Sequence, residues 1–307
     1  MNVLLATEKP FAAPAVDAIR RTVEAAGMTL SRLEKYTAKA QLLDAVAGAD
    51  AVIIRSDIID GEVLDAARQL KIVVRAGAGY DNVDLASATA HRVCVMNTPG
   101  QNANAVAELA LGLMVYGVRA FFSGAPGTEL KGKKLGIHAY GNVGRHVARI
   151  AAGFGMETYA FDPFLPAGAI EKDGVTPLSS APEMYAACRF VSLHIPATAE
   201  TRDSIGYDLL ASMPEGAMLV NTARREVVHE AGLLRVMTER PDFRYMTDVM
   251  PGIHAELTAT CAGRYFSTPK KAGAQTAEAN NNAGIAAAAQ IVDFLLNGNE
   301  QFRVNPS

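Results

Sequence analysis

Two glycines and one aspartate stand at a spacing that suits a bound dinucleotide. A short apolar run precedes Gly141 and Gly144, and apolar residues then recur at helical spacing up to Phe154. A second apolar run ends at Asp162, 18 residues after Gly144. Glycines let a backbone approach a pyrophosphate at a helix N-terminus, and an acid about 20 residues further on binds the ribose hydroxyls of NAD. The stretch therefore predicts a strand–helix–strand unit that binds NAD, and the charge of Asp162 disfavours the 2′-phosphate of NADP.

The glycine motif is incomplete, because Ala139 stands at its first glycine position. One incomplete motif is weak evidence, and an ordinary packing corner between a strand and a helix is the alternative. Asp162 at the expected end of the second strand, followed by Pro163, favours the dinucleotide. We expect the first strand to span residues 135–139 and so to include Ala139.

Two arginines each close an apolar run in the N-terminal third of the chain. Arg55 ends the run AVIIR, and Arg75 ends the run KIVVR. Residues 76–79, Ala-Gly-Ala-Gly, follow Arg75 directly. Small residues let backbone N–H groups come close to a carboxylate or a phosphate. These positions predict a binding site for an anionic substrate, whereas a glycine turn with two solvated arginines is the alternative.

Parallel strands are needed to position these residues, and the pattern along the chain predicts them. Short β-rich runs alternate with helical patterns, which indicates α/β architecture with doubly wound parallel sheets that bind ligands at the carboxyl ends of their strands. Expected strands are residues 3–5, 51–54, 72–74, 93–96, 135–139, 158–161, 190–193, 218–220 and 245–249. Expected helices are residues 16–26, 38–46, 102–118 and 277–296, and we expect residues 251–263 to be irregular.

Composition and charge exclude several classes of protein. The net charge is −3, from 29 basic and 32 acidic residues, which gives no electrostatic basis for binding nucleic acid or an anionic membrane. Cys94, Cys188 and Cys261 are too widely separated for a metal or disulfide pattern. Glu8 and Lys9 come too early for a signal peptide, and no apolar run reaches the ~18 residues of a membrane span. We expect a cytoplasmic protein with reduced thiols, two domains and no metal site.

Five sequence blocks, in order, carry a resemblance to a known family. The blocks are IIRSDIID, VVRAGAGYDNVDL, VMNTPGQNANAVAEL, LVNTARREVV and STPKKAGAQTAEAN. From end to end the chain resembles the D-2-hydroxyacid dehydrogenases, and within them the short, lysine-type subgroup that acts on D-3-phosphoglycerate. The resemblance implies an NAD-binding Rossmann domain, residues 98–277, inserted into a flavodoxin-like substrate domain, residues 1–97 and 278–307. Because the chain ends at Ser307, it also implies that the regulatory domains of longer relatives are absent.

The resemblance assigns roles to particular positions. Arg224 matches the catalytic arginine that orients the carboxylate and the 2-oxygen of the substrate, a bidentate task that suits a planar guanidinium. Positions matched to cofactor binding are Ala78, Gly141, Asn142, Val143, Gly144, Asp162, His194, Ile195, Thr222, Ala223, Asp248 and Gly273. Positions matched to substrate binding are Arg55, Ser56, Arg75, Ala76 and Gly77.

The acid/base position departs from the family pattern. Most members have a histidine in T-P-H-x-G, but residues 268–273 read TPKKAG, with one extra residue and no histidine. Counting back from the glycine places Lys271 there, and counting forward from the proline places Lys270 there. The supporting glutamate falls near Ile253, and Glu256 is the nearest acid. Loss of both partners favours replacement by a lysine, and we predict Lys271, with Lys270 as the alternative.

One histidine competes with the lysines. His254 lies in the segment expected to be irregular, beside Glu256, whereas we expect the other histidines except His194 to be structural. To accept a proton, a lysine must be neutral part of the time, and we expect burial and the nearby charge of Arg224 to favour its neutral form.

The predicted function is NAD-dependent oxidation of D-3-phosphoglycerate to 3-phosphohydroxypyruvate, as in serine biosynthesis. Arg55 and Arg75 together favour a phosphorylated substrate. A nearer alternative is a reductase for glyoxylate, hydroxypyruvate or another 2-oxo acid, and a more distant one is an NAD-sensing binding protein. The resemblance also implies a homodimer that pairs through the helix expected over residues 102–118.

Overall fold

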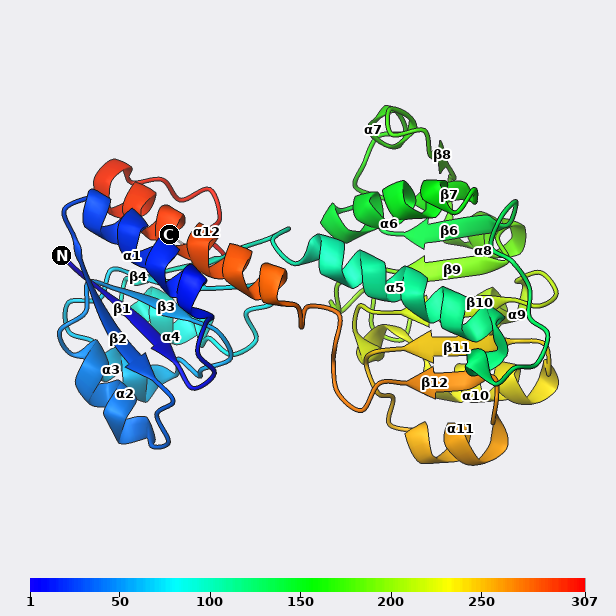
Figure 1. Ribbon diagram of the computed structural model, residues 1–307, viewed down its shortest axis with the longest axis horizontal. Coiled ribbons are helices and arrows are strands. Elements are labelled where there is room, and N and C mark those ends of the chain that lie inside the picture. Colours follow the sequence, from blue (N-terminus) through cyan, green and yellow to red (C-terminus); the bar gives the residue numbers. More distant parts are fainter. Residues whose placement is uncertain (307) are drawn as a thin grey trace. The chain divides into compact units, whose positions relative to one another are not determined.

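The computed structural model describes residues 1–306, and the chain divides into two compact units (Figure 1). The first unit comprises Met1–Asn102 and the residues from Thr276 onward, and the second comprises Ala103–Gln275. The long helix α12 (Ala277–Asn297) therefore belongs to the same unit as the N-terminal strands. One continuous stretch of chain forms the second unit.

The first unit contains a parallel sheet of five strands in the order β2-β1-β3-β4-β5. These strands are β1 (Asn2–Thr7), β2 (Thr29–Glu34), β3 (Ala51–Ile54), β4 (Ile72–Arg75) and β5 (Cys94–Asn97). This is the flavodoxin-like order, and its direction reverses between β1 and β3. Arg55 and Ser56 follow β3 directly, so they lie at the edge where such sheets bind ligands.

Helices cover both faces of the first sheet. They are α1 (Ala13–Ala25), α2 (Lys39–Val46), α3 (Gly61–Ala66), α4 (Leu85–Ala90) and α12. Helices α1 and α12 share one core, in which Ile19 and Ile291 are fully buried. A Cβ on Gly284 of α12 would lie 2.8 Å from the Phe11 ring, so the small residues of α12 permit this close packing. Helices α2, α3 and α4 contribute to the core on the other face.

The second unit contains a parallel sheet of seven strands in the order β12-β11-β10-β9-β6-β7-β8. These strands are β6 (Lys134–His138), β7 (Glu157–Phe161), β8 (Thr176–Pro177), β9 (Phe190–Leu193), β10 (Met218–Asn221), β11 (Arg244–Thr247) and β12 (Tyr265–Ser267). Six of them follow the Rossmann order, with β12 added at one edge, and the direction reverses between β6 and β9. The predicted fold class, two doubly wound α/β sheets, is confirmed.

Two layers of helices enclose the second sheet. The elements are α5 (Ala103–Val118), η1 (Ala120–Phe122), α6 (Asn142–Gly153), α7 (Gly168–Glu171), α8 (Ala181–Ala187), α9 (Tyr207–Ala211), η2 (Arg225–Val227), α10 (Glu230–Glu239) and α11 (His254–Thr260). Helices α5 and α6 pack on one face, around Leu135, Ile137 and Met218. Helices α8, α9 and α10 pack on the other face, around Val191, Leu219 and Tyr245.

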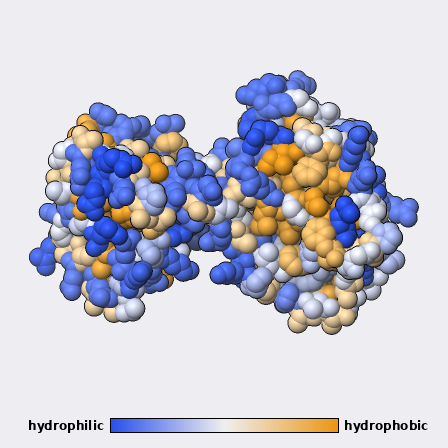
Figure 2. Space-filling view, viewed as in Figure 1, coloured by the Kyte–Doolittle hydropathy of each residue, from blue (hydrophilic) through white to orange (hydrophobic). Residues whose placement is uncertain are grey.

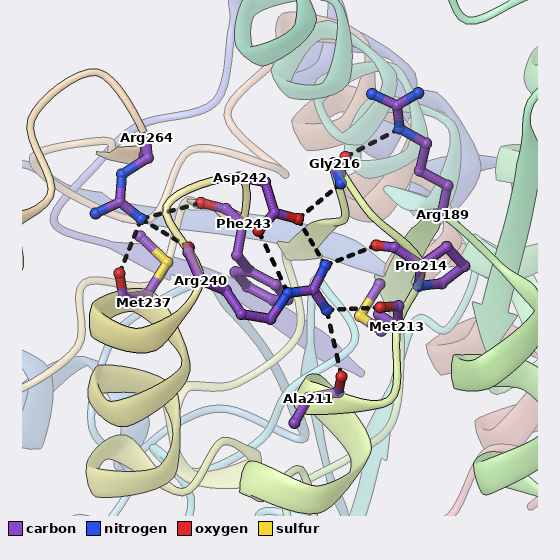
Figure 3. Close-up of polar contacts among 10 residues, drawn as sticks. All are labelled: Arg189, Ala211, Met213, Pro214, Gly216, Met237, Arg240, Asp242, Phe243 and Arg264. Atoms are coloured by element: carbon purple, nitrogen blue, oxygen red, sulfur yellow. Dashed lines mark hydrogen bonds and ion pairs between the residues drawn. The ribbon is translucent and has the colours of Figure 1, made fainter.

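Arginine side chains tie helix ends to strand starts at the amino edge of the second sheet (Figure 3). Arg240 follows α10, and its guanidinium pairs with Asp242 at 2.6 Å. The carbonyl acceptors are those of Ala211, Met213 and Pro214 for Arg240, and those of Met237, Arg240 and Phe243 for Arg264. Helix C-termini leave carbonyl groups unpaired, and basic side chains bind them. These structural bonds fix the edge of the sheet opposite to the carboxyl edge.

Three local predictions are wrong. Residues 251–263 are not irregular throughout, because α11 forms after Pro251 and Gly252 and buries Leu257. With one fully buried position, a helix this short has no detectable period. The strand expected over residues 245–249 ends at Thr247, and the strand expected over residues 135–139 ends at His138. Asp248 and Ala139 therefore lie just beyond the ends of their strands.

Ala139 has a left-handed backbone, with φ of 73°. Its N–H donates to the Phe161 carbonyl at 2.9 Å, and the next N–H, that of Tyr140, donates to Asp162 Oδ2 at 2.8 Å. A Cβ on Gly144 would lie 2.5 Å from the Ala139 carbonyl oxygen, so the turn and the helix start touch. A glycine at this first position of the motif would adopt the left-handed backbone without strain. Ala139 adopts it at a cost of roughly 1–2 kcal/mol.

We predict that Ala139→Gly leaves the free energy of unfolding unchanged or raises it by up to about 1 kcal/mol. Relief of the left-handed alanine, about 1–2 kcal/mol, exceeds the entropy cost of a new glycine, about 0.5–1 kcal/mol. Urea unfolding measures the change. The matched control is Ala152→Gly, at an exposed position of α6, which should lose about 0.5–1 kcal/mol. Equal losses in the two variants would contradict the assignment of strain.

Candidate active site

Predicted cofactor residues form a row along the carboxyl edge of the second sheet. Leu193, Asn221 and Thr247 are paired at one register, so the residues that follow them, His194, Thr222 and Asp248, are neighbours. The register continues through β6 and β7, because His138 is paired with both Leu193 and Phe161. Ala139 and Asp162 therefore extend the same row. Sheet topology thus brings together residues that lie far apart in the sequence.

Three buried polar atoms in this row have no hydrogen-bond partner within residues 1–306. They are Nε2 of His194, Oγ1 of Thr222 and Oδ1 of Asp248. Buried polar atoms in folded proteins almost always have a partner, so three orphaned atoms at neighbouring positions indicate a bound group with several polar atoms. All three residues were predicted from the sequence to bind NAD. The residues present fit a dinucleotide on this edge.

The glycine turn provides an anion site at the reversal point of the sheet. Gly141 is the N-cap of α6, and no side chain caps the helix. The N–H groups of Asn142, Val143 and Gly144 lie in the first turn, where a helix has no internal acceptor for them. Backbone N–H groups at a helix N-terminus suit a pyrophosphate. Asp162 is fixed beside this turn, since Oδ1 accepts from the Phe164 N–H at 2.9 Å and Oδ2 accepts from Tyr140.

Two neighbouring histidines at the reversal point are neutral. Burial lowers the pKa of His138 to about 4. Burial, together with the charge that His138 carries when it is protonated, lowers the pKa of His194 to about 3. His138 Nδ1 lies 3.3 Å from the hydroxyl of Tyr185, which agrees with the structural role expected for it. A neutral His194 places an uncharged imidazole against the cofactor site, with one ring nitrogen lacking a partner. Ile195, which follows it, is buried.

Two cationic side chains that were predicted from the sequence to be catalytic donate hydrogen bonds to one backbone oxygen. The Ala223 carbonyl accepts from Arg224 Nη1 at 3.0 Å and from Lys271 Nζ at 3.1 Å. Because both bonds end on one oxygen, these nitrogens are at most about 6 Å apart. A carboxylate and a hydroxyl on adjacent carbons can meet two such groups together. The arrangement suits a 2-hydroxy acid.

Asn221 braces the turn that carries this carbonyl. Its side chain is fully buried, accepts from the Ala223 N–H at 3.0 Å and donates to the Arg224 carbonyl at 2.9 Å. Thr247 Oγ1 donates to the Asn221 carbonyl at 2.8 Å, so β11 supports the turn from the next strand. Sequence reasoning missed Asn221. A signal was present, because an asparagine directly after an apolar strand favours a turn closed by its own side chain.

Asp248 fixes the loop that carries Lys271. Its Oδ2 accepts from the Ala272 N–H at 3.0 Å and from the Gly273 N–H at 2.6 Å. A Cβ on Gly273 would lie 3.0 Å from that oxygen, so glycine permits this close approach. These bonds hold Ala272 and Gly273 at the end of β11. The position of Lys271 is therefore set by its spacing from Gly273, and Lys271 is the lysine that reaches the Ala223 carbonyl.

The two lysines differ in their contacts. Lys270 is exposed, and its side chain makes no hydrogen bond or ion pair within the described part of the chain, whereas Lys271 reaches Ala223. Lys271 is exposed too, so the burial expected for it from the sequence is absent. The geometry favours Lys271 over Lys270 for a role beside Arg224, and the role itself stays a prediction.

The competing histidine has a structural partner. His254 Nδ1 lies 2.8 Å from the Tyr265 hydroxyl, and the two rings are in edge contact. Glu256 is exposed in the first turn of α11 and does not form a pair with this histidine. The structure therefore gives no support to His254 as the base.

In the first unit, the predicted substrate-binding residues include two arginines, Arg55 and Arg75, whose side chains are held by hydrogen bonds. The Arg55 guanidinium donates to the carbonyls of Lys9 and Pro10 and to Asn280 Oδ1, and burial lowers the pKa of Arg55. Arg75 Nε donates to the Arg55 carbonyl at 3.1 Å. Arg55 is thus already engaged within its own unit, by residues distant in the chain that no local pattern predicts.

The small residues after Arg75 leave room for its side chain. A Cβ on Gly77 would lie 1.4 Å from Arg75 Nη1, and the backbone there has φ of 148°, so only glycine fits. Ala76 is buried, Ser56 is exposed, and the Ala78 carbonyl accepts from the side-chain amide of Asn97. Gly77 therefore leaves room for the Arg75 guanidinium.

Residues 1–306 contain neither a metal-binding cluster nor a membrane-spanning helix. No cluster of three His, Cys, Asp or Glu side chains within residues 1–306 could hold a metal ion. None of the helices in that range is both long and apolar enough to cross a membrane.

Comparisons with known proteins agree with the geometry. Residues 119–260 match the family model described as D-isomer specific 2-hydroxyacid dehydrogenase, NAD binding domain. The structure of NAD+-bound 3-phosphoglycerate dehydrogenase from Entamoeba histolytica is 45% identical, with a TM-score of 0.88, covering 100% of this chain and 99% of that one. A hydroxypyruvate reductase from Thermotoga maritima is 32% identical, covering 85% of this chain and 90% of the relative.

Longer relatives match over part of their length. D-3-phosphoglycerate dehydrogenase from Methanocaldococcus jannaschii is 32% identical over 84% of this chain, but the match covers 52% of that protein. This chain therefore spans about half the length of that curated relative.

Proposed function

The chain belongs to the D-isomer specific 2-hydroxyacid dehydrogenase family, and on that premise we propose that it oxidises D-3-phosphoglycerate to 3-phosphohydroxypyruvate with NAD, as in serine biosynthesis. The observation that carries the proposal is the meeting of Arg224 and Lys271 at the Ala223 carbonyl, beside the row of orphaned polar atoms. We assign NAD binding and the reacting end of the substrate to the second unit, and binding of the substrate phosphate to the first.

In the proposed reaction, bound NAD supplies the hydride acceptor for C2 of the substrate. Arg224 binds the substrate carboxylate and 2-oxygen with its planar guanidinium, and so orients C2. The side chain of Lys271, in its neutral form, accepts the hydroxyl proton as the hydride leaves, and the hydroxyl carbon becomes a carbonyl. Asn221 keeps Arg224 in place through the backbone turn. Reduction of the 2-oxo acid runs the same steps backwards, with the lysine ammonium as the proton donor.

The choice of a phosphorylated substrate rests on Arg75 and Arg55. We propose that Arg75 contacts the phosphate and that Arg55 supports it, because the Arg55 guanidinium is engaged with Lys9, Pro10 and Asn280 while its carbonyl accepts from Arg75. The second candidate function is hydroxypyruvate reduction, which the match over 90% of the Thermotoga maritima protein favours. Hydroxypyruvate has no phosphate, so substrate preference separates the two.

We propose that the protein is a homodimer paired through α5. A helix that is apolar all round is normally buried on all sides. Leu109, Val115 and Tyr116 of α5 are only partly buried, and Phe122, in ring contact with Tyr116, is 67% exposed. Figure 2 shows an apolar patch on this face of the second unit. Exposed patches of this kind mark interaction sites, and a second copy offers a matching apolar face.

We predict that Lys271→Ala lowers kcat for oxidation by on the order of 10²-fold or more, the usual contribution of a general base. NAD binding, followed by the quenching of protein fluorescence or by calorimetry, should stay near wild type. Lys270→Ala is the matched control, since it removes an adjacent exposed lysine that does not contact Ala223. A normal kcat in Lys271→Ala with a loss in Lys270→Ala would shift the assignment by one residue.

We predict that wild-type protein forms NADH at alkaline pH faster with D-3-phosphoglycerate than with D-glycerate or D-lactate. Arg75→Ala should raise KM for D-3-phosphoglycerate by on the order of 10-fold or more, because a charge-assisted phosphate contact is worth about 1.5–3 kcal/mol. KM for D-glycerate should change much less. Equal losses on both substrates would indicate a structural role for Arg75, and a wild-type preference for D-glycerate would favour the reductase.

We predict that light scattering at micromolar concentration gives twice the mass of one chain. Phe122→Asp should increase the monomer fraction, because it places a charge within the apolar face of α5 and η1. Phe164→Asp is the control, since this phenylalanine is 91% exposed and lies in the segment after β7. A wild-type monomer, or equal dissociation in the two variants, would rule out this interface.

A further inference from the structure

A cluster of four arginines lies at the amino edge of the second sheet, opposite to the edge that carries the cofactor residues. Its members are Arg189 before β9, Arg240 after α10, Arg244 at the start of β11 and Arg264 before β12. Strand pairing brings them together, because β10 bonds to the Arg189 carbonyl on one side and pairs with Arg244 on the other, while β11 bonds to the Arg264 carbonyl. Four like charges therefore gather at one edge.

Three of the four guanidiniums have acceptors within the second unit. Arg240 pairs with Asp242, and Arg264 Nη1 donates to three backbone carbonyls. Arg189 Nε donates to the Gly216 carbonyl at 3.0 Å, and a Cβ on Gly216 would lie 2.5 Å from Arg189 Nη2, so glycine leaves room for this side chain. In Figure 3, Arg189 and Arg264 lie on either side of the Arg240–Asp242 pair. Of these three arginines, Arg240 alone is paired with a carboxylate within residues 1–306.

Arg244 differs from the other three, because its side chain has no acceptor. Its Nε is buried without a hydrogen-bond partner, and the guanidinium forms no ion pair within residues 1–306. Burial and the charges of Arg189 and Arg264 lower the pKa of Arg244, whereas a carboxylate nearby acts in the opposite direction. An arginine guanidinium nevertheless stays protonated in proteins. A charged donor therefore lies among like charges with its Nε unsatisfied.

The nearby carboxylates do not supply the missing acceptor. Both oxygens of Asp242 are engaged, because Arg240 donates to each of them and the Gly216 N–H donates to Oδ2 at 2.7 Å. Glu215 is exposed, and its side chain makes no hydrogen bond or ion pair in the described part of the chain. Positive charge thus exceeds negative charge at this edge, and an anion from outside the chain can balance it.

We infer that the arginine cluster is a binding site for a small phosphate anion, on the opposite edge of the sheet from the NAD site. Buried polar atoms almost always have a partner, so Arg244 Nε indicates a bound group, as the orphaned atoms of the cofactor row do. Planar guanidiniums bind phosphate through two parallel hydrogen bonds. A phosphate has enough oxygens and charge to meet Arg244 together with Arg189 and Arg264. The site does not depend on which 2-hydroxy acid the chain oxidises.

The test observes the Arg244 Nε–H group directly by NMR. In protein labelled with 15N-arginine, this signal is assigned by its loss in Arg244→Lys, and NAD is kept at saturation so that the glycine turn is filled. We expect inorganic phosphate to move the signal to a saturating limit, whereas chloride at the same ionic strength should not. A signal that does not move, that follows ionic strength alone, or that saturates with citrate but not with phosphate would overturn the phosphate site.

A second measurement is the melting temperature, again with NAD at saturation. Arg244→Met removes the guanidinium and keeps an unbranched stem, and it leaves the substrate site unchanged. Phosphate at a hundredfold excess over its Kd should raise the melting temperature of wild type by on the order of 5 °C more than that of Arg244→Met, because a ligand that binds only the folded state stabilises it. In chloride alone, Arg244→Met should melt no lower than wild type, since the Nε that it removes has no partner within residues 1–306.

The control variant is Arg235→Met. Arg235 is an exposed arginine of α10 that pairs with Glu239 at 2.8 Å and lies outside the cluster, so the effect of phosphate should persist in this variant. Equal effects of phosphate on wild type and Arg244→Met would overturn the site. A lower melting temperature of Arg244→Met in chloride would overturn it too, because Arg244 would then have a structural role that needs no anion.

Discussion

The arrangement of the second unit depends on one constraint, that two cations share the Ala223 carbonyl oxygen. Two unit charges at the upper bound of about 6 Å repel by roughly 1–3 kcal/mol, depending on how far water screens them. A hydrogen bond from a charged group to a carbonyl contributes about 1.5–3 kcal/mol, so two such bonds offset the repulsion. The carbonyl can do this only while it stays fixed, and Asn221 and Thr247 provide that rigidity from two adjacent strands.

Neutral and charged side chains follow one another along the carboxyl edge of the second sheet. At the reversal point His138 and His194 are uncharged, since burial lowers the pKa of each far below neutrality. Two strands away Asp248 is buried but bonded by two N–H groups. Polar atoms without partners lie between the glycine turn and this aspartate. The row therefore runs from an anion site at the start of α6 to the pair of cations. A bound dinucleotide would extend along the sheet in the same order, from its pyrophosphate to the end that accepts the hydride.

Strain and close approach mark the positions at which the backbone must bend. Ala139 is left-handed where a glycine would be unstrained, and Gly144 has no room for a side chain. Gly77 and Gly273 each lie against a charged side chain, Arg75 in one case and Asp248 in the other, and glycine leaves room for that side chain. Local sequence rules identify such glycines as turns, but at Gly273 the charged neighbour, Asp248, comes from a distant part of the chain.

The sequence alone determined the alternation of strands and helices, the glycine turn with Asp162, and the family blocks that contain Arg224 and the two lysines, because each is a local pattern of spacing. Only the tertiary structure decided which lysine reaches the Ala223 carbonyl, since the choice depends on the bonds that Asp248, after β11, accepts from residues 272 and 273, after β12. It also decided that Arg55 is engaged by Asn280, 225 positions away. The short helix α11 went unforeseen because its packing comes from one buried leucine rather than from a repeated pattern. Contacts between distant segments are set by strand order and register, which no local spacing encodes.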